Sequence, residues 1–338
     1  SVSRLLCWLF SSFLFAPNRV CAESVGSVAD PTMFRVASAV KKALNVSLVI
    51  SGKMAACDNG NSQKKGLDRS EKMPSSYLEK ILATNILRES TLKAAIKALE
   101  FPQASKGLDA GCGAGLQCLL LADEIGTGGH VTGLDISTEF LEYGEKIVRN
   151  AGLAERISFI EGSVECIPFD DDSFDWAWSA DCVGYGPWEP MPLLKELKRV
   201  TRSDGTLAIL AWSSECLLPG YPMLEARLNA TTPGMAPFSN KMEPSRHFLR
   251  ALGWLRELEL KEPSAQVFSG SAQAPLSGDL FTALEMLFEM RWVGVTEELS
   301  ENDRAEYERL CKPESPDFIL RHPDYYAFFT YSMFYGTV

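Results

Sequence analysis

Two short segments of the chain combine glycine with carboxylates at spacings that suit a ligand-binding site. In the segment GLDAGCGAG, Gly111, Gly113 and Gly115 alternate with small residues, and Asp109 stands two places before the first of them. Glycine lets the backbone bend tightly and approach a ligand closely, and the amides at the start of a following helix are free to donate hydrogen bonds. By themselves, the three glycines would also fit a turn that binds nothing.

A second carboxylate suggests what the turn binds. Asp135 lies at the end of the apolar segment VTGLDI, twenty residues after Gly115. An acidic residue at that place can accept hydrogen bonds from both hydroxyls of a ribose. A carboxylate at Asp109 would repel a pyrophosphate at the turn, whereas it suits a ligand that brings an ammonium group. The residues therefore predict a site for a nucleoside that carries an amino acid.

The segments around these residues alternate between strand and helix patterns. Strands are predicted at 106–109, 131–136, 157–162, 174–181 and 206–212, with helices at 115–125, 138–150 and 190–200 between them. This alternation predicts right-handed βαβ units and a parallel sheet covered on both faces. Ligands of such sheets bind beyond the carboxyl ends of the strands, where the glycine turn and Asp135 lie. Ahead of the first strand, helical spacing predicts two amphipathic helices, with Ser90 and Thr91 as caps of the second over 92–100.

With these segments in order, the chain resembles the class I S-adenosylmethionine-dependent methyltransferases from about Tyr77 to its C-terminus. The matching segments are GLDAGCGAG, VTGLDIS, EGSVECIPFDDDSFDWAWSAD, LLKELKRVTRSDGTLAILAW, ALGWLRELEL for a helix and the sixth strand, and YYAFFTYSMFYGTV for the final strand. The style of GSVECIPFDDDSFD is closest to the group that includes ubiquinone and menaquinone C-methyltransferases and many small-molecule enzymes. The resemblance implies an α/β, Rossmann-like, doubly wound sheet, mostly parallel with an antiparallel last strand, and S-adenosylmethionine as cofactor.

The resemblance also assigns cofactor contacts to particular residues. These are Asp109, Gly111, Gly113, Gly115, Asp135, Ile136, Ser163, Val164 and Ala180. Asp109 and Gly111 would contact the methionine end, Asp135 the ribose, and Ile136 the adenine, whose edge would face Ser163 and the Val164 backbone. Family members often have Asp where Ser163 stands, and a hydroxyl accepts more weakly than a carboxylate, which puts the affinity in question. Taken singly, apolar residues such as Ile136 and Val164 are more typical of a protein core.

Methyl transfer needs little from the protein beyond positioning. The sulfonium is already activated, so holding the acceptor in line with it can account for much of the rate enhancement. A general base is needed only if the acceptor enters protonated, and Asp181, Tyr185 and His247 are the candidates for that role.

Specificity for the acceptor should depend on the segments that this chain adds to the core shared by the family. We expect a small organic acceptor in an apolar or aromatic pocket, where ring faces could also hold a cationic amine. The added parts are the N-terminal helices, residues 213–243, and a helical insertion at about 275–322 that we expect to close over the strand ends as a lid.

Three alternative functions share part of this pattern. An inactive protein that only binds the cofactor would keep the same residues, and a nicotinamide-dependent oxidoreductase would share the glycines and Asp135. Arsenite methylation would use Cys182 and Cys216, although that chemistry needs a third thiol and none is evident. The run Asp170–Asp172 reads as a solvated turn, and no metal site is expected from it.

Composition bears on partners and location. A net charge of −11 gives no basic surface for nucleic acid, so no nucleic-acid partner is expected. Nine scattered cysteines without metal-site spacing read as reduced thiols and favour a cytoplasmic protein. The sequence does not predict the oligomeric state.

The first part of the chain is expected to lie outside the domain. Residues 1–72 read as a leader or linker ahead of a methyltransferase domain at 73–338, with Met54 or Met73 as possible functional starts. Residues 1–22 alternatively resemble a targeting peptide, which would make the protein exported or organellar. Their apolar run is too short for a membrane span, so no stable insertion is expected.

Overall fold

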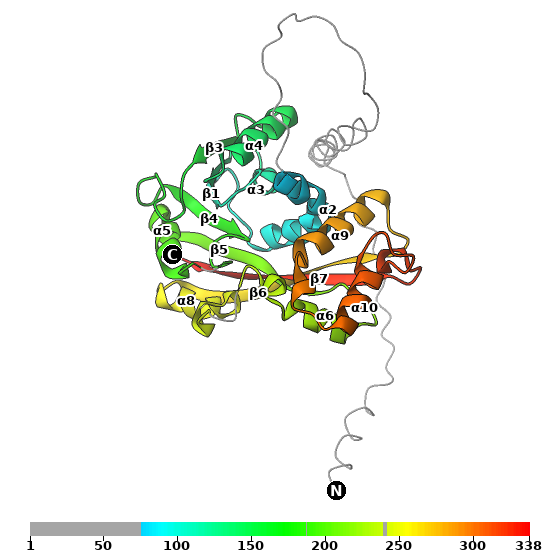
Figure 1. Cartoon of the computed structure of the whole chain (residues 1–338). Coiled ribbons are helices and arrows are strands. Elements are labelled where there is room, and N and C mark those ends of the chain that lie inside the picture. Colours follow the sequence, from blue (N-terminus) through cyan, green and yellow to red (C-terminus); the bar gives the residue numbers. More distant parts are fainter. Residues whose placement is uncertain (1–75, 187, 239–241) are drawn as a thin grey trace, which may run out of the picture.

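The computed structural model describes residues 76–186, 188–238 and 242–338, so the expected leader at 1–72 lies outside the described residues. Its centre is a seven-stranded sheet in the order β3-β2-β1-β4-β5-β7-β6 (Figure 1). The parallel strands are β1 (Lys106–Ala110), β2 (His130–Asp135), β3 (Ile157–Glu161), β4 (Phe174–Ala180) and β5 (Thr201–Cys216). The last strand, β7 (Tyr326–Thr337), runs antiparallel between β5 and β6 (Lys261–Gln273). The predicted mostly parallel sheet with an antiparallel last strand is confirmed.

Helices cover both faces of the sheet, so it is doubly wound as predicted. One face carries α2 (Ser76–Ala98), α3 (Leu116–Glu124) and α4 (Thr138–Ala151), and the other carries α5 (Pro190–Val200) and α8 (Ala251–Glu257). Apolar side chains of β4 point alternately to the two faces of the sheet, so both faces must be covered by helices. Trp176 and Trp178 pack into the core under the first group of helices, whereas Ala177 packs into the core under the second.

Two predictions about element boundaries were wrong. The two expected N-terminal helices form one helix, α2, because residues 76–98 contain no glycine or proline to end it. Thr91, expected near a cap, is buried inside that helix, and a Cβ at Gly270 of β6 would lie only 2.8 Å from its hydroxyl oxygen. The sixth strand begins at Lys261 rather than within ALGWLRELEL, because the chain turns at Glu259, whose φ is +58°.

Further helices lie near the C-terminal end of β5 and the N-terminal end of β7. These are α6 (Pro222–Asn229), α7 (Thr232–Met235), α9 (Gly278–Arg291) and α10 (Glu301–Cys311), with 3-10 turns at Pro244–Arg246, Phe248–Arg250, Val295–Glu297 and Ile319–Arg321. The helical part of the expected insertion at 275–322 is therefore α9 and α10, and α9 packs along α2 with an ion pair of 3.1 Å between Lys80 and Glu289. Its action as a lid stays a prediction. Among the helices of the described residues, none is both long and apolar enough to cross a membrane.

Candidate functional site

The glycine turn after β1 has the conformation that its sequence predicts. Gly111, Gly113 and Gly115 have φ angles of +77°, +53° and +72°, which residues with a side chain rarely adopt. Space is limiting as well, because a Cβ at Gly111 would lie 2.3 Å from the sulfur of Cys182. A Cβ at Gly115 would lie 2.5 Å from the ring of Phe159. The turn thus needs glycine at all three positions for its conformation and at two of them for space.

Asp135, at the end of β2, joins the glycine turn to the start of α4. One carboxylate oxygen accepts a hydrogen bond from the amide of Gly113 at 2.8 Å, and the other accepts from the amide of Ser137 at 2.9 Å. Ser137 is the N-cap of α4. Each carboxylate oxygen has two lone pairs, so each keeps one acceptor position for a ligand. Asp135 is partly exposed, which leaves these positions accessible.

Asp109 lies beneath the turn. Its side chain belongs to a residue that is only 1% exposed, and its carboxylate accepts from the thiol of Cys118 at 3.2 Å. Burial raises the pKa of Asp109 from 3.8 to about 7; the Cys118 thiol opposes this rise, and the charge of Asp135 adds to it. A cation next to this carboxylate would favour its ionised form, which is what a ligand ammonium group can supply.

The raised pKa of Asp109 predicts a pH-dependent loss of stability. The folded protein holds this proton more tightly than the unfolded chain does. The contribution of the protonated carboxyl to the free energy of unfolding is therefore fully present below pH 3.8, and it is lost as the pH rises from there through about 7. Asp109→Asn removes the titration. We expect the free energy of unfolding of this variant, relative to wild type, to increase by about 2 to 4 kcal/mol between pH 4 and pH 8. Chemical denaturation at the two pH values measures the change, and an equal difference at both would contradict it.

The residues expected around an adenine lie beyond the ends of β2 and β3. Ile136 is 74% exposed, which is unusual for a large apolar side chain and leaves it free to pack against a ligand. The hydroxyl of Ser163 accepts from the amide of Glu165 at 3.1 Å and retains one lone pair and its own hydrogen. Val164 is buried, so its side chain belongs to the protein core, as the alternative interpretation of this residue predicts.

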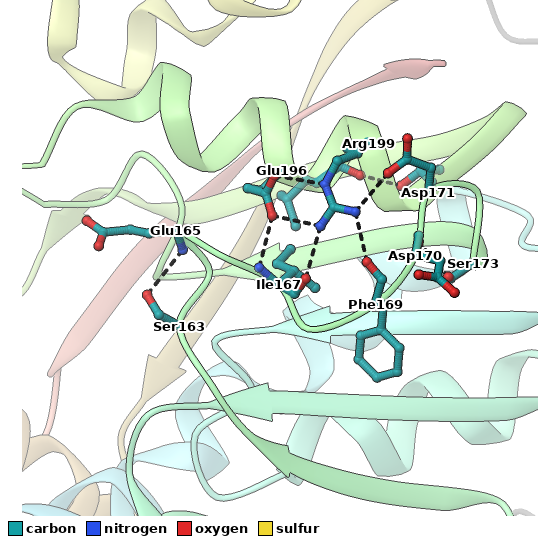
Figure 2. A network of polar contacts seen from close by, with 11 residues as sticks. Ser163, Glu165, Ile167, Phe169, Asp170, Asp171, Ser173, Glu196 and Arg199 are labelled. Carbon is teal, nitrogen blue, oxygen red and sulfur yellow. Dashed lines mark hydrogen bonds and ion pairs between the residues drawn. The ribbon is translucent and has the colours of Figure 1, made fainter.

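An arginine on α5 fixes the segment that follows Ser163 (Figure 2). Arg199 donates to two carbonyl oxygens of this segment, at 2.8 and 2.9 Å, and to the carboxylates of Glu196 and Asp171. Glu196 in turn accepts from the amide of Ile167 at 2.9 Å. In the acidic run Asp170–Asp172, the exposed Asp171 therefore pairs with Arg199. Within the described residues, no three His, Cys, Asp or Glu side chains are grouped to hold a metal ion.

The carboxyl end of β4 is held by a network around Asp181. Its carboxylate accepts from the amide of Trp212 at 2.9 Å and from the hydroxyl of Tyr331 at 3.0 Å, and the guanidinium of Arg88 lies 3.5 Å away. Burial raises the pKa of Asp181, while Arg88 and the Trp212 amide act against the rise. The side chain connects α2, β5 and β7 to the strand end next to Ala180, which is itself buried.

A cavity of about 700 Å³ opens beyond the end of β4, beside Trp212 to Glu215 in the last part of β5. Its rings are Tyr185, Trp212, Phe238, His247 and Phe248, and its other polar side chains include Ser213, Glu215, Asn229 and Arg291. The structure brings Tyr185 and His247 together through Phe238. The Phe238 ring centroid lies 5.3 Å from that of Tyr185 and 4.6 Å from that of His247.

Tyr185 and His247 are arranged to donate hydrogen bonds. The Nδ1 atom of His247 accepts from the amide of Leu249 at 3.2 Å, so Nε2 carries the hydrogen of the neutral ring. Burial lowers the pKa of His247, which favours that neutral ring near pH 7. Burial, together with the charges of Asp181 and Glu215, raises the pKa of Tyr185, so its phenol keeps its proton. Both side chains are better suited to donate to a ligand than to remove a proton from it.

Several residues of the site were missed in the sequence. Arg88 pairs with Asp181, Glu215 with Arg291, and Asn229 with Trp292, and the partners of each pair are far apart along the chain. Arg291 lies in the last turn of α9, where a basic residue is ordinary because it complements the helix dipole. Nothing in the local pattern distinguishes it from a surface arginine.

The thiols considered for arsenite are too far apart to share one arsenic atom. The amide of Asp181, just before Cys182, donates to the carbonyl of Leu210 at 2.8 Å. Cys216 lies six residues beyond Leu210 on β5, which is about 20 Å of strand. Burial raises the pKa of Cys182 to about 12, so this thiol is also a poor source of thiolate. This alternative was wrong for these two residues.

Sequence comparisons with known proteins identify the family. Residues 108–209 match the methyltransferase domain family. A demethylmenaquinone methyltransferase of Listeria monocytogenes is 30% identical over 185 residues, which make up 54% of this chain and 70% of that protein. The crystal structure of the YcgJ protein from Bacillus subtilis aligns at 17% identity and a TM-score of 0.47, covering 74% of this chain and 98% of that one. A SAM-dependent methyltransferase of Aquifex aeolicus aligns at 20% identity and a TM-score of 0.39, covering 54% and 88%.

Proposed function

Because the chain belongs to the class I S-adenosylmethionine-dependent methyltransferases, we propose that it transfers a methyl group to a small organic acceptor bound in the cavity beyond the end of β4. The observation that carries this proposal is the position of the cavity. The backbone amide of its lining residue Trp212 donates a hydrogen bond to Asp181, which directly follows Ala180 at the end of β4. The glycine turn and Asp135 lie at the same edge of the sheet, since β1, β2, β4 and β5 are parallel.

The proposed cofactor contacts follow the positions of these residues. Asp109 and Gly111 would serve the methionine end, Gly113 and Gly115 shape the turn, and Asp135 would accept from the ribose. Ile136, Ser163 and the backbone of Val164 would face the adenine, and Ala180 would lie beside the methyl group. The two carboxylates of the site suit S-adenosylmethionine. Asp135 retains two acceptor positions for hydroxyls, and Asp109 is a buried carboxylate whose ionised form an ammonium group favours.

The chain's own contribution to the reaction is positioning. Bound S-adenosylmethionine supplies an activated methyl group, and the acceptor's attacking atom must lie in line with the bond that breaks. Asp181 holds the end of β4 against β5, and with it the spacing between the cofactor turn and the cavity. The rings that line the cavity would shield the acceptor from water.

The acceptor itself does not follow from the relatives. The similar Listeria protein is named for demethylmenaquinone, but the family match of this chain ends at residue 209, before Trp212 and most of the cavity lining. The proposal is therefore limited to a small organic molecule. An inactive protein that binds the cofactor is the alternative, and turnover separates the two.

Binding and turnover can be tested on the same protein. We expect S-adenosylmethionine at one hundred times its dissociation constant to raise the free energy of unfolding by about 2.7 kcal/mol, and NADH to leave it unchanged. Release of S-adenosylhomocysteine is then measured across a panel of phenols, carboxylic acids, amines and thiols. Binding without turnover of any acceptor would favour the inactive alternative, and absence of binding would refute the proposed cofactor site.

A further inference from the structure

The polar side chains of the cavity are mostly hydrogen-bond donors, and Arg291 is the principal one. Its Nε donates to Glu215 at 2.6 Å and one Nη donates to the carbonyl of Gly234. An arginine has five N–H groups. Among the described residues the other three have no hydrogen-bond partner, and Arg291 lines the cavity.

Glu215 holds Arg291 in place and does not itself face the cavity as a free carboxylate. Its side chain is only 3% exposed. One oxygen accepts from Arg291 and the other accepts from the indole N–H of Trp212, both at 2.6 Å. The carboxylate is thus engaged on both oxygens, and it fixes the guanidinium at the cavity.

Three other side chains of the cavity lining add hydrogen-bond donors. Trp292 can only donate, and its indole N–H lies 2.9 Å from the Oδ1 of Asn229, so the NH₂ group of Asn229 is the end that remains. The Nε2–H of His247 and the phenol of Tyr185 are also donors, for the reasons given above. These three side chains and Arg291 line the same cavity.

Charge in the cavity has the sign opposite to that of the whole chain. Among the described lining residues, Arg250 and Arg291 are positive and Glu215 is negative, which gives two minus one, or +1, in a chain of net charge −11. The rings of Phe238 and Phe248 add apolar surface to the same lining. An ammonium group would find no unpaired carboxylate in the described lining, so the cationic amine considered from the sequence is disfavoured.

We propose that the methyl acceptor is an organic anion with an apolar or aromatic body, and that Arg291 is the residue that selects it by binding a carboxylate, phenolate or enolate oxygen. This inference rests on the proposed function, since it concerns the acceptor of that reaction. The guanidinium offers a charged, planar set of donors to the oxygen, and the rings cover the body of the molecule. Asn229, His247 and Tyr185 supply further donors in the same cavity, the last two beside the ring of Phe238.

Three probes of one shape test this selectivity. They are 1-naphthoate, 1-naphthamide and 1-naphthylmethylamine, each titrated by calorimetry into protein saturated with S-adenosylhomocysteine. We expect the dissociation constant of naphthoate to be at least about tenfold lower than that of the amide, with the amine weakest. Naphthoate that fails to bind, or that binds no better than the amide, would overturn the proposal. A protein that fails to bind S-adenosylhomocysteine would instead count against the proposed function.

Variants of Arg291 then assign the effect to that side chain. Arg291→Met would leave Glu215 buried and unpaired, so it is combined with Glu215→Gln, and Glu215→Gln alone is the reference. We expect the double variant to lose about 10- to 100-fold in affinity for naphthoate and less than about threefold for naphthamide. Arg227→Met is a matched control, because Arg227 pairs with Asp303 at 2.6 Å and is not among the cavity lining. Equal losses for naphthoate and naphthamide in the double variant, with affinity for S-adenosylhomocysteine unchanged, would overturn the role of Arg291.

Discussion

Gly111→Ala will lose at least about 100-fold in affinity for S-adenosylmethionine and about 2 to 5 kcal/mol of stability. A side chain at φ +77° costs about 1 to 2 kcal/mol. The added Cβ would also lie 2.3 Å from the sulfur and 2.6 Å from the Cβ of Cys182, and overpacking of this kind costs about 1 to 3 kcal/mol more. To relieve the clash, the turn has to move away from β4, and its ligand-facing amides move with it. Calorimetric titration and thermal melting measure the two effects.

Gly152→Ala is the matched control for this prediction. Gly152 has a φ of +71° at the C-cap of α4, but a Cβ there meets nothing within 4 Å. We expect it to lose about 1 kcal/mol of stability and no affinity. Cys182→Gly removes both atoms that the new methyl group would strike, so it should restore part of the affinity of Gly111→Ala. A Gly111→Ala protein that binds the cofactor as wild type does would mean that the turn is not part of the site.

The core of the fold, and the meeting of the glycine turn with Asp135, could be predicted because their signals are local. Gly111, Gly113 and Gly115 needed positive φ in a strand-to-helix turn, and Asp135 stands at the end of the next strand. Parallel strands bring such ends to one edge, so short segments read in order are enough to place these residues together. The prediction of two N-terminal helices was wrong because residues 76–98 contain no glycine or proline to end the first, and Thr91 lies beside Gly270 of β6 instead of capping a second helix.

The cavity proposed for the acceptor could not be predicted because it is built from contacts between distant segments. Glu215 and Arg291 are 76 residues apart, and neither stands in a recognisable pattern. His247 was noted in the sequence, but the orientation of its ring depends on a bond to the amide of Leu249. Hydrogen-bond direction, rather than residue type, decides that this cavity offers donors, and direction is known only once the partners are placed.

Asp135→Ala will reduce affinity for S-adenosylmethionine by about tenfold to a few hundredfold. Hydrogen bonds to a charged group contribute about 1.5 to 3 kcal/mol each, and each 1.4 kcal/mol is a factor of ten. The variant also leaves the amides of Gly113 and Ser137 without their carboxylate partner, so about 1 to 3 kcal/mol of stability should be lost with the affinity. Ser137→Ala separates the two effects. It removes the side-chain cap of α4, with an expected loss of about 1 kcal/mol of stability, and leaves Asp135 in place.

The ribose contact itself is isolated by changing the ligand together with the protein. S-adenosylhomocysteine and its 2′-deoxyribose analogue are titrated into wild type, Ser137→Ala and Asp135→Ala. If Asp135 accepts from the 2′-hydroxyl, wild type and Ser137→Ala will bind the analogue about tenfold or more weakly than S-adenosylhomocysteine, whereas Asp135→Ala will bind the two nearly equally. A carboxylate that only holds Gly113 and Ser137 in place would weaken both ligands by the same factor in Asp135→Ala and leave their ratio as in wild type. An unchanged ratio would therefore remove Asp135 from the nucleoside site while keeping its part in the fold.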